Sequence, residues 1–473
     1  MFYNFDIIQP EKIAVIESES DIHYPYSELD DYSNFMVELL SGNKKRLSFL
    51  FCNNTFGTIA SYIGILRSGN AVLLLDKNIT PELRENLINI YKPELLINFP
   101  YEEQNGYRWV CGDKFTNLVE RLNVEDLPHI NPELAVLLST SGTTGSPKLV
   151  RLTYKNLQSN ALSIMQYLSI TEYDKPITSL PMSYSYGLSV INSHLLAGAT
   201  IIATNKSLVN REFWTIFNKY ECSSFAGVPY HYQMLMRLRF EKMELPSLRK
   251  MTQAGGRLSE EFIRYFYDAS LKKQIKFFVM YGQTEATARI SYLPWERLCE
   301  KIGSIGIPIP GGKIVLMGDG APIRTVGIEG ELVYYGDNVM LGYATSREDL
   351  AKGDELGGML QTGDIARRDA DGYYYITGRM KRFIKLFGLR LNLDEIEKML
   401  ENRFSLPVAA IGTDDRLILV AGEVSRQHQK EILHSITETY KIHHSVVEIV
   451  FISKIPVTQS GKKDYAELNE LVK

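Results

Sequence analysis

The segment 138–150 reads LSTSGTTGSPKLV, and the interpretation of the whole chain starts from it. Apolar residues 134–138 before it predict a buried strand, and residues 148–152 after it alternate as in a second strand. Glycines let a backbone approach a ligand closely, while free N–H groups and hydroxyl side chains suit phosphate oxygens. Lys148 adds a positive charge. The segment therefore indicates a hydroxyl-rich turn between two strands that could hold phosphate.

The turn does not follow the P-loop pattern, because Pro147 stands where that motif needs glycine and no Ser or Thr follows Lys148. Composition alone leaves a flexible surface turn and a phosphate site equally open. The string TSGTTGSPK, however, closely resembles the phosphate-binding signature of the adenylate-forming superfamily of acyl-CoA synthetases, peptide-synthetase adenylation domains and luciferases. The resemblance implies an ATP-binding role for Thr140, Ser141, Gly142, Thr143, Thr144, Gly145 and Lys148.

A second motif follows the apolar strand pattern of residues 277–280 and reads YGQTE over residues 281–285. Tyr281 offers a face on which adenine could stack, Thr284 can donate to a phosphate, and Glu285 can bind Mg²⁺ through an oxygen. The string resembles the YGxTE motif of the same superfamily. The resemblance implies that Thr284 and Glu285 are catalytic and that Glu285 is the metal ligand.

Three further matches concern the nucleotide. Gly255 and Gly256 end a predicted strand, where doubly wound sheets place their ligands, and by resemblance they line the adenine pocket. Asp364, in a Thr-Gly-Asp sequence, can accept two hydrogen bonds from a vicinal diol, and the resemblance assigns it to the ribose hydroxyls. Arg379, in a stretch similar to the family's GRxxxxIK, would contact the ribose or the α-phosphate.

The C-terminal part of the chain carries the remaining matches. Lys462 lies in PVTQSGK, which resembles the PxTxxGK motif whose mobile lysine is catalytic. Lys381 falls at the family's hinge. The resemblance also implies that Gly388 lines a pantetheine tunnel and that Arg390 meets phosphate there.

The acid pocket is the least readable part of the site, and we predict Tyr184, Tyr230 and Gly282 as its members. Acyl-CoA synthetases commonly carry histidine where Tyr184 stands, and amino-acid-activating domains place an aspartate nearby. Residues 179–188 contain neither. A hydroxylated aromatic wall cannot supply the charge that an α-ammonium group needs, so an amino-acid substrate is disfavoured but left open.

Strands and helices alternate over residues 1–130, which predicts an α/β fold of doubly wound sheets with helices on both faces. Glycine-rich turns after residue 303 predict a β-rich subdomain, and a small α+β lobe of plausible domain size follows residue 380. We expect an N-terminal domain over residues 1–379 and a mobile C-terminal domain over residues 380–473.

The composition is that of an ordinary soluble protein, with 473 residues and a net charge of −4. We therefore expect no binding to nucleic acid. There is no signal-peptide pattern, no apolar run of membrane-spanning length, and no pairing pattern among the four cysteines. A cytoplasmic protein is expected.

The combined pattern predicts an AMP-forming ligase. Such an enzyme activates a carboxylic acid with ATP and Mg²⁺, releases pyrophosphate, and passes the acyl group from acyl-AMP to a thiol. The sequence does not choose between CoA and the phosphopantetheine of a carrier protein as acceptor. Open alternatives are an amino-acid-activating enzyme that loads a stand-alone carrier protein, a luciferase-like oxidase and a silent adenylate-binding protein. The last predicts loss of Glu285, Asp364 or Lys462, all of which are present.

Overall fold

The structure is a computed structural model that describes residues 1–99, 105–123, 127–139, 148–379, 382–386, 389–413, 416–422, 426–440, 442–458 and 463–472. The chain forms two compact units, each described by itself. Unit 1 comprises Met1–Lys313 and Tyr335–Leu360, and unit 2 comprises Ile314–Tyr334 and Gln361–Lys473. The predicted hinge at Lys381 lies outside the described residues, and the boundary at residue 380 stays a prediction.

The largest sheet of unit 1 combines parallel central strands with antiparallel edges. Its strand order is β19 (Gly342–Ala344), β9 (Leu149–Thr153), β8 (Leu134–Ser139), β4 (Ala71–Asp76), β3 (Leu47–Cys52), β5 (Leu95–Ile97), β7 (Asn117–Arg121) and β6 (Tyr107–Gly112). The predicted strands on either side of the phosphate turn thus form an antiparallel pair, with Ser139 opposite Leu149.

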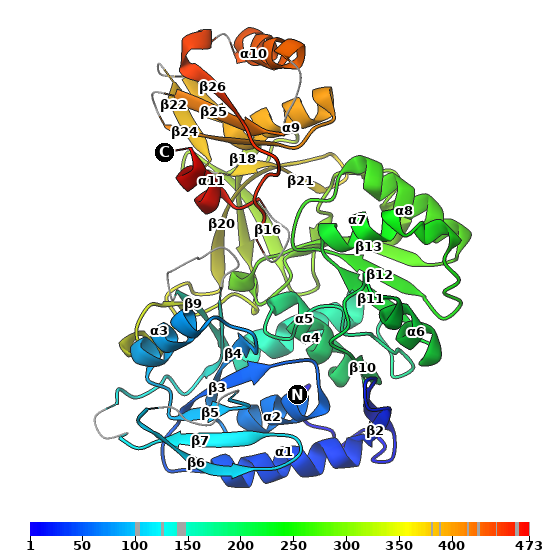
Figure 1. Cartoon of the computed structure of the whole chain (residues 1–473), viewed down its shortest axis with the longest axis vertical. Helices are drawn as coiled ribbons and strands as arrows, with labels where there is room; N and C mark the ends of the chain where they lie inside the picture. Colours follow the sequence, from blue (N-terminus) through cyan, green and yellow to red (C-terminus); the bar gives the residue numbers. More distant parts are fainter. Residues whose placement is uncertain are drawn as a thin grey trace. The chain divides into compact units, whose positions relative to one another are not determined.

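Helices cover both faces of this sheet, as expected from the alternation of side chains along buried strands (Figure 1). Leu50 of β3 packs in the cluster that holds α1 (Tyr26–Leu40), α2 (Phe56–Arg67), α4 (Tyr154–Tyr167) and α5 (Ser185–Leu196). Its neighbours Phe49 and Phe51 point the other way, into a cluster with α3 (Pro81–Tyr91). The core of unit 1 is therefore layered, with the sheet between helices.

A second sheet of unit 1 brings three parallel strands to a common edge. Its order is β11 (Ser224–Gly227), β12 (Lys250–Gln253), β13 (Lys276–Tyr281), β14 (Ser291–Leu293) and β15 (Ile307–Pro308). The first three are parallel and in register, so their carboxyl ends meet where the site motifs begin.

Other elements complete unit 1. They are β1 (Ile13–Glu17), β2 (Ile22–Pro25) and β10 (Ile201–Ala203), the helices α6 (Arg211–Lys219), α7 (Pro229–Arg237) and α8 (Glu260–Lys272), and the short 3₁₀ turns η1 (Phe240–Lys242), η2 (Thr284–Ala286), η3 (Trp295–Arg297) and η4 (Glu348–Ala351).

Unit 2 contains the predicted β-rich subdomain and the predicted α+β lobe. The subdomain is a sheet in the order β17 (Ala321–Pro322), β16 (Lys313–Gly318), β18 (Glu329–Tyr335), β20 (Met359–Arg368) and β21 (Tyr374–Arg379). The lobe has the hairpin β22 (Phe383–Leu386) and β23 (Leu389–Asn392), a sheet of β24 (Val408–Thr413), β25 (Arg416–Ala421) and β26 (Val447–Phe451), the turn η5 (His444–Val446), and helices α9 (Leu393–Phe404), α10 (Arg426–Tyr440) and α11 (Tyr465–Leu471). Helices α9 and α10 pack on one face of β24–β26 and α11 on the other.

The predicted α/β class is confirmed, with two local differences. The main sheet is mixed rather than purely parallel, because β9 and β19 at one edge and the hairpin β6–β7 at the other pair antiparallel. The residue types predict a helix over residues 26–40 that is capped at Ser27. Helix α1 instead starts after Pro25 and has no side-chain cap, so Ser27 lies inside the helix. No helix in the described part of the chain has both the length and the apolar content needed to cross a bilayer.

Candidate functional site

Two glycine positions at the ends of β12 and β13 leave room for a ligand and for neighbouring chain. Gly255 has φ +83°, and a Cβ there would lie 2.7 Å from the hydroxyl oxygen of Tyr184. A Cβ on Gly282 would lie 2.0 Å from the carbonyl oxygen of Ala288. Neither position therefore accepts a side chain, and both place backbone at the edge where the parallel strands end. Tyr281 closes β13, and Gly256 directly follows Gly255.

Thr284 lies just beyond this edge, at the start of the short turn η2. Its side chain is buried, and its hydroxyl lies 3.4 Å from the hydroxyl of Ser185 at the start of α5. The two hydroxyls can each donate or accept, so they can turn toward an oxygen-rich ligand. The structure thus brings the predicted Thr284 next to Ser185, which the sequence analysis did not identify as a site residue.

Glu285 is held by a tyrosine from a distant part of the chain. The Tyr343 hydroxyl donates to Glu285 Oε1 at 2.8 Å, and the Met340 amide donates to the Glu285 carbonyl at 2.9 Å. Burial and the Glu285 charge raise the pKa of Tyr343, so its phenol keeps the proton that this hydrogen bond needs. Lys148 places its ammonium 3.4 Å from the centre of the same ring. Tyr343 therefore joins the end of the phosphate turn to the predicted metal ligand.

These contacts have a local cause. Strand β19 pairs antiparallel with β9, and Tyr343 lies opposite Val150, two residues after Lys148. Sequence analysis missed Tyr343 because its partners are far away in the chain, and the short sequence Leu341-Gly342-Tyr343 gives no signal by itself.

The two tyrosines predicted for the acid pocket have different environments. Tyr184 is partly buried, precedes α5 and contacts Gly255. Burial raises its pKa, and the positive charge of Arg289 opposes that rise. Tyr230 lies on α7 with 46% of its surface exposed. The structure thus places Tyr184 against Gly255, whereas Tyr230 is nearly half exposed.

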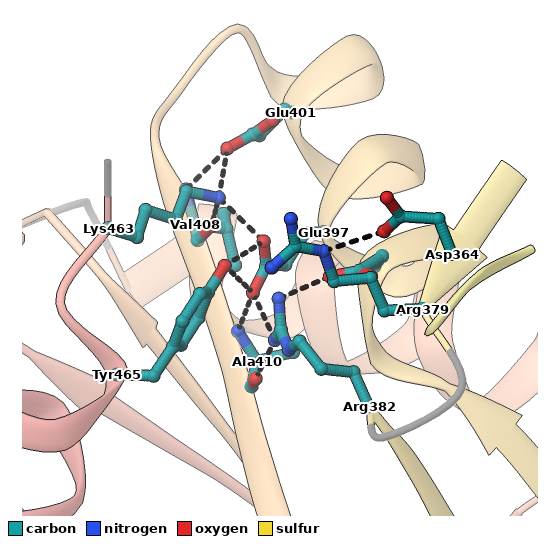
Figure 2. Close-up of polar contacts among 10 residues, drawn as sticks. Asp364, Arg379, Arg382, Glu397, Glu401, Val408, Ala410, Lys463 and Tyr465 are labelled. Carbon is teal, nitrogen blue, oxygen red and sulfur yellow. Dashed lines mark hydrogen bonds and ion pairs between the residues drawn. The ribbon is translucent and has the colours of Figure 1, made fainter. Parts of the chain in front are cut away.

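The residues predicted to bind ribose lie in unit 2. Asp364 of β20 is directly opposite Arg379 of β21, and Arg379 Nε donates to Asp364 Oδ1 at 2.9 Å (Figure 2). Asp364 is 3% exposed, while 60% of the Arg379 side chain is exposed. Arg379 therefore holds a buried carboxylate in place, while more than half of its own side chain is exposed.

A charge network lies in the lobe of unit 2, around Glu397 of α9 (Figure 2). Glu397 accepts from Arg382 at 2.7 Å, from Lys463 at 2.7 Å and from the Tyr465 hydroxyl at 2.9 Å. Arg382 also binds Asp394, and Lys463 also binds Glu401 at 2.7 Å. Burial raises the pKa of the Glu397 carboxyl, but Lys463 and Arg382 outweigh it and lower that pKa overall. The carboxylate is therefore stable in its charged form despite being buried.

Several predicted site residues lie outside the described part of the chain, namely Thr140, Ser141, Gly142, Thr143, Thr144, Gly145, Lys381, Gly388 and Lys462. Arg390 belongs to β23, but its side chain is likewise not described. The roles of all these residues stay predictions.

Glu285 suits Mg²⁺, which prefers hard oxygen ligands and usually binds through one or two carboxylates and the substrate's phosphates. One of its oxygens accepts from Tyr343, and this fixes the carboxylate while leaving the other oxygen for a cation. Within the described residues, no group of three or more His, Cys, Asp or Glu side chains could hold a metal ion by itself. The residues present thus fit an ion shared with a nucleotide.

The chain belongs to the AMP-binding enzyme family, whose model matches residues 8–344. The prediction of an adenylate-forming enzyme, an AMP-forming acid–thiol ligase, is thereby confirmed at the level of class.

Among its relatives, the chain is 27% identical to 2-succinylbenzoate–CoA ligase of Bacillus subtilis over 419 residues, which cover 86% of this chain and 84% of that enzyme. It is 29% identical to feruloyl-CoA synthase of an Amycolatopsis species, over 71% of this chain and 70% of that one. The structure of o-succinylbenzoate CoA synthetase from Bacillus subtilis, in complex with its acyl-adenylate intermediate, superposes with a TM-score of 0.77. That match has 22% identity and covers 97% and 96% of the two chains, so it shows a shared fold. The same enzyme, in complex with ATP and a magnesium ion, gives a TM-score of 0.75 at 21% identity, over 98% and 97%.

Proposed function

We propose that this protein joins a carboxylic acid to the thiol of CoA through an acyl-adenylate, with ATP and Mg²⁺. Family membership supports the adenylating half of this reaction. The printed activities of the sequence relatives, which are acid–CoA ligases, support CoA as the acceptor. A carrier-protein phosphopantetheine is the competing acceptor, and a cytoplasmic location goes with either.

One observation supports the proposal most strongly. Lys148 contacts the Tyr343 ring, the Tyr343 hydroxyl binds Glu285, and Thr284 directly precedes Glu285. This arrangement places a cation and a fixed carboxylate on the two sides of a single phenol. A cation of this kind can neutralise a phosphate, and the carboxylate can hold Mg²⁺. A core cluster would not need a lysine and a glutamate at these two places.

In the first half-reaction, an oxygen of the acid attacks the α-phosphorus of ATP, and the bond from that phosphorus to the bridging oxygen breaks. Pyrophosphate leaves with the electron pair, and acyl-AMP remains. Both reactants are anions, so the site must offset negative charge. Lys148 and Thr284 do this from unit 1, and we assign the same task to Lys462. A magnesium ion, when bound at Glu285, adds charge compensation on the triphosphate.

In the second half-reaction, the thiolate sulfur attacks the acyl carbon and AMP leaves. We propose that residues 380–473 move as a lobe about Lys381 between the two steps, as in the predicted domain division. Gly388 would then line the tunnel through which the pantetheine thiol enters, and Arg390 would contact phosphate there. Asp364, held by Arg379, would bind the ribose throughout, since a buried carboxylate can accept from two hydroxyls.

Pyrophosphate exchange into ATP, measured over a panel of aliphatic, aryl and amino acids, tests the first step, and acyl-CoA formation tests the second. We expect Glu285→Gln to lower the exchange rate roughly 10²- to 10³-fold, as for loss of one preorganised charge-stabilising group. Glu296→Gln, an exposed residue of η3 in the same unit, is the matched control and should keep the full rate.

Lys462→Ala should abolish adenylation while ATP still binds. The proposal is wrong if the folded protein exchanges no pyrophosphate with any acid, or if both lysine and glutamate variants react at the normal rate. Acyl transfer to a carrier protein but not to CoA would reassign the acceptor only.

A further inference from the structure

A small cavity lies in the interior of unit 1, next to the predicted acid pocket. Aliphatic side chains form most of its wall, including Ile164 of α4, Val190 of α5 and Ile177. Three residues with nitrogen-bearing side chains also line the cavity, namely Arg289, His194 and Lys250. The space for the centres of water-sized molecules is about 20 Å³, which is room for one or two waters. The cavity could therefore hold one polar group of a ligand, but not a whole acid.

Arg289 is the unusual member of this set. It is 3% exposed, and its guanidinium lies over the Tyr186 ring with 4.0 Å to the ring centre. One terminal nitrogen donates to the Ala288 carbonyl at 3.2 Å, and the guanidinium also hydrogen-bonds to the Tyr167 hydroxyl. Its Nε has no partner. Each group of the described residues that contacts this cation is neutral.

Three other buried cations of unit 1 contact a carboxylate. Arg347 binds Glu94 through both terminal nitrogens, at 2.6 and 3.0 Å. Lys250 lies 2.8 Å from Asp174, and Arg151 is paired with Glu355. Among the residues that the structure describes, none offers Arg289 such a carboxylate. Burial of a charge without a counter-charge is unfavourable by several kcal/mol, so the site is incomplete without an anion.

His194 sets a limit on what the cavity accepts. Its Nδ1 bonds to the Val190 carbonyl at 2.8 Å, and burial lowers its pKa to about 4. The ring is therefore neutral, with the proton on Nδ1, and its unpartnered Nε2 is an acceptor. A carboxylate has no proton to give, so a water molecule or a hydroxyl group must satisfy His194, and Arg289 must take the anion.

The cavity shares a wall with the predicted acid pocket. Tyr186 follows Tyr184 by two residues, and the two ring centres are 6.3 Å apart. A Cβ on Gly282 would lie 2.8 Å from the Arg289 Cα. Tyr184 and Gly282 are thus next to Arg289, with Thr284 two residues beyond Gly282. An acid whose reacting carboxylate lies near Thr284 can point its far end toward the guanidinium.

We propose that Arg289 selects acids that carry a second carboxylate, so that the preferred substrates are dicarboxylic acids with an apolar spacer. The assignment rests on the proposed function, because it names the acid that this ligase activates. The second carboxylate enters the small cavity and accepts a hydrogen bond from the Arg289 guanidinium, and the spacer lies in the adjoining acid pocket. Recognition by a buried charge of this kind rejects neutral analogues strongly, since they leave the charge without a partner.

The test compares matched acids in which only the far group changes. Aliphatic and aromatic diacids of several spacer lengths are each paired with the half-amide, which has nearly the same shape and no charge. We expect kcat/KM for pyrophosphate exchange to be roughly 10²- to 10³-fold higher for the best diacid than for its half-amide. In Arg289→Gln this ratio should fall to near one, because the KM for the diacid rises while the rate with the half-amide stays unchanged. Arg237→Gln, which removes an exposed arginine of α7, should leave the ratio unchanged.

A wild-type enzyme that activates half-amides or simple monoacids as well as diacids would overturn the assignment while leaving the ligase activity in place. The wild-type comparison decides the question even if Arg289→Gln fails to fold. If no acid at all supports exchange, the proposed function fails instead. A melting-temperature shift by diacids that half-amides and Arg289→Gln do not show would then still support the anion site, and no shift would refute it.

Discussion

Arg289 of unit 1 is buried and Arg382 of unit 2 is partly buried, and the two arginines have opposite surroundings. Arg382 in the lobe of unit 2 binds Asp394 and Glu397 and lies over the Tyr465 ring at 3.8 Å. Arg289 in unit 1 also lies over a tyrosine ring, but its other contacts are a carbonyl and a phenol. The aromatic contact is shared, but among the described residues only Arg382 contacts carboxylates, and Figure 2 shows its contact with Glu397.

The difference distinguishes a cation with a structural role from a cation whose counter-charge comes from a ligand. A buried ion pair with further hydrogen bonds holds its surroundings in one arrangement, and removal of either member leaves the other uncompensated. A buried cation without an anion adds little stability to the ligand-free protein. Its presence is explained when a bound molecule supplies the missing negative charge. Charge variants of the two networks should therefore behave differently in the absence of substrate.

The largest effect is expected for Glu397→Gln in unit 2. This change removes the charge that Arg382 and Lys463 share, so two partly buried cations lose their common partner. We expect the free energy of unfolding to fall by about 3–5 kcal/mol. Urea unfolding measures it through a lower midpoint at an unchanged slope.

Glu448→Gln is the matched control, because Glu448 and Arg416 also form a 2.9 Å pair in the lobe, but both are about half exposed. Its cost should stay below about 1 kcal/mol. Equal losses for the two glutamates would contradict the view that the Glu397 network holds the lobe together.

A smaller effect is expected from pH. Because the folded-state pKa of Glu397 is lowered, its ionised form adds stability above the usual glutamate pKa, and this stability is lost as pH falls through the folded value. The gap in unfolding free energy between wild type and Glu397→Gln should thus be largest at neutral pH and narrow in acid. Urea titrations at a series of pH values check this. A gap that widens as the pH falls would mean that Glu397 is not stabilised as an anion.

Sequence patterns predicted the backbone of this protein better than its site contacts. Residues 134–139 and 149–153 form the expected strands around the phosphate turn, and Thr153 caps α4 with a capping box as local chemistry suggests. The start of α1 was misplaced because Ser27 is a good cap by type, yet Pro25 already allows the helix to begin.

The contacts between site residues could not be predicted from the sequence, for a different reason. Glu285 and Tyr343 are 58 residues apart, and they meet only because β19 pairs with β9. Arg289 was not identified from the sequence, because its burial and its lack of a carboxylate partner among the described residues become visible only in the fold. Motifs thus predict residues for a nucleotide site, whereas contacts such as that of Tyr343 with Glu285 depend on tertiary structure.

The smallest expected effect tests the comparison between Arg289 and Arg382 most directly. In Arg289→Met, measured without substrate, a thioether replaces an unpaired cation of similar length in an apolar wall. The change loses the contact of the cation with Tyr186, worth about 1–2 kcal/mol when desolvated, and relieves the burial of an uncompensated charge. We expect these terms to oppose each other and the unfolding free energy to stay within about 1 kcal/mol of wild type. A loss of about 3 kcal/mol or more by urea unfolding would show that Arg289 is a structural cation like Arg382, and would remove the reason to seek its anion in the substrate.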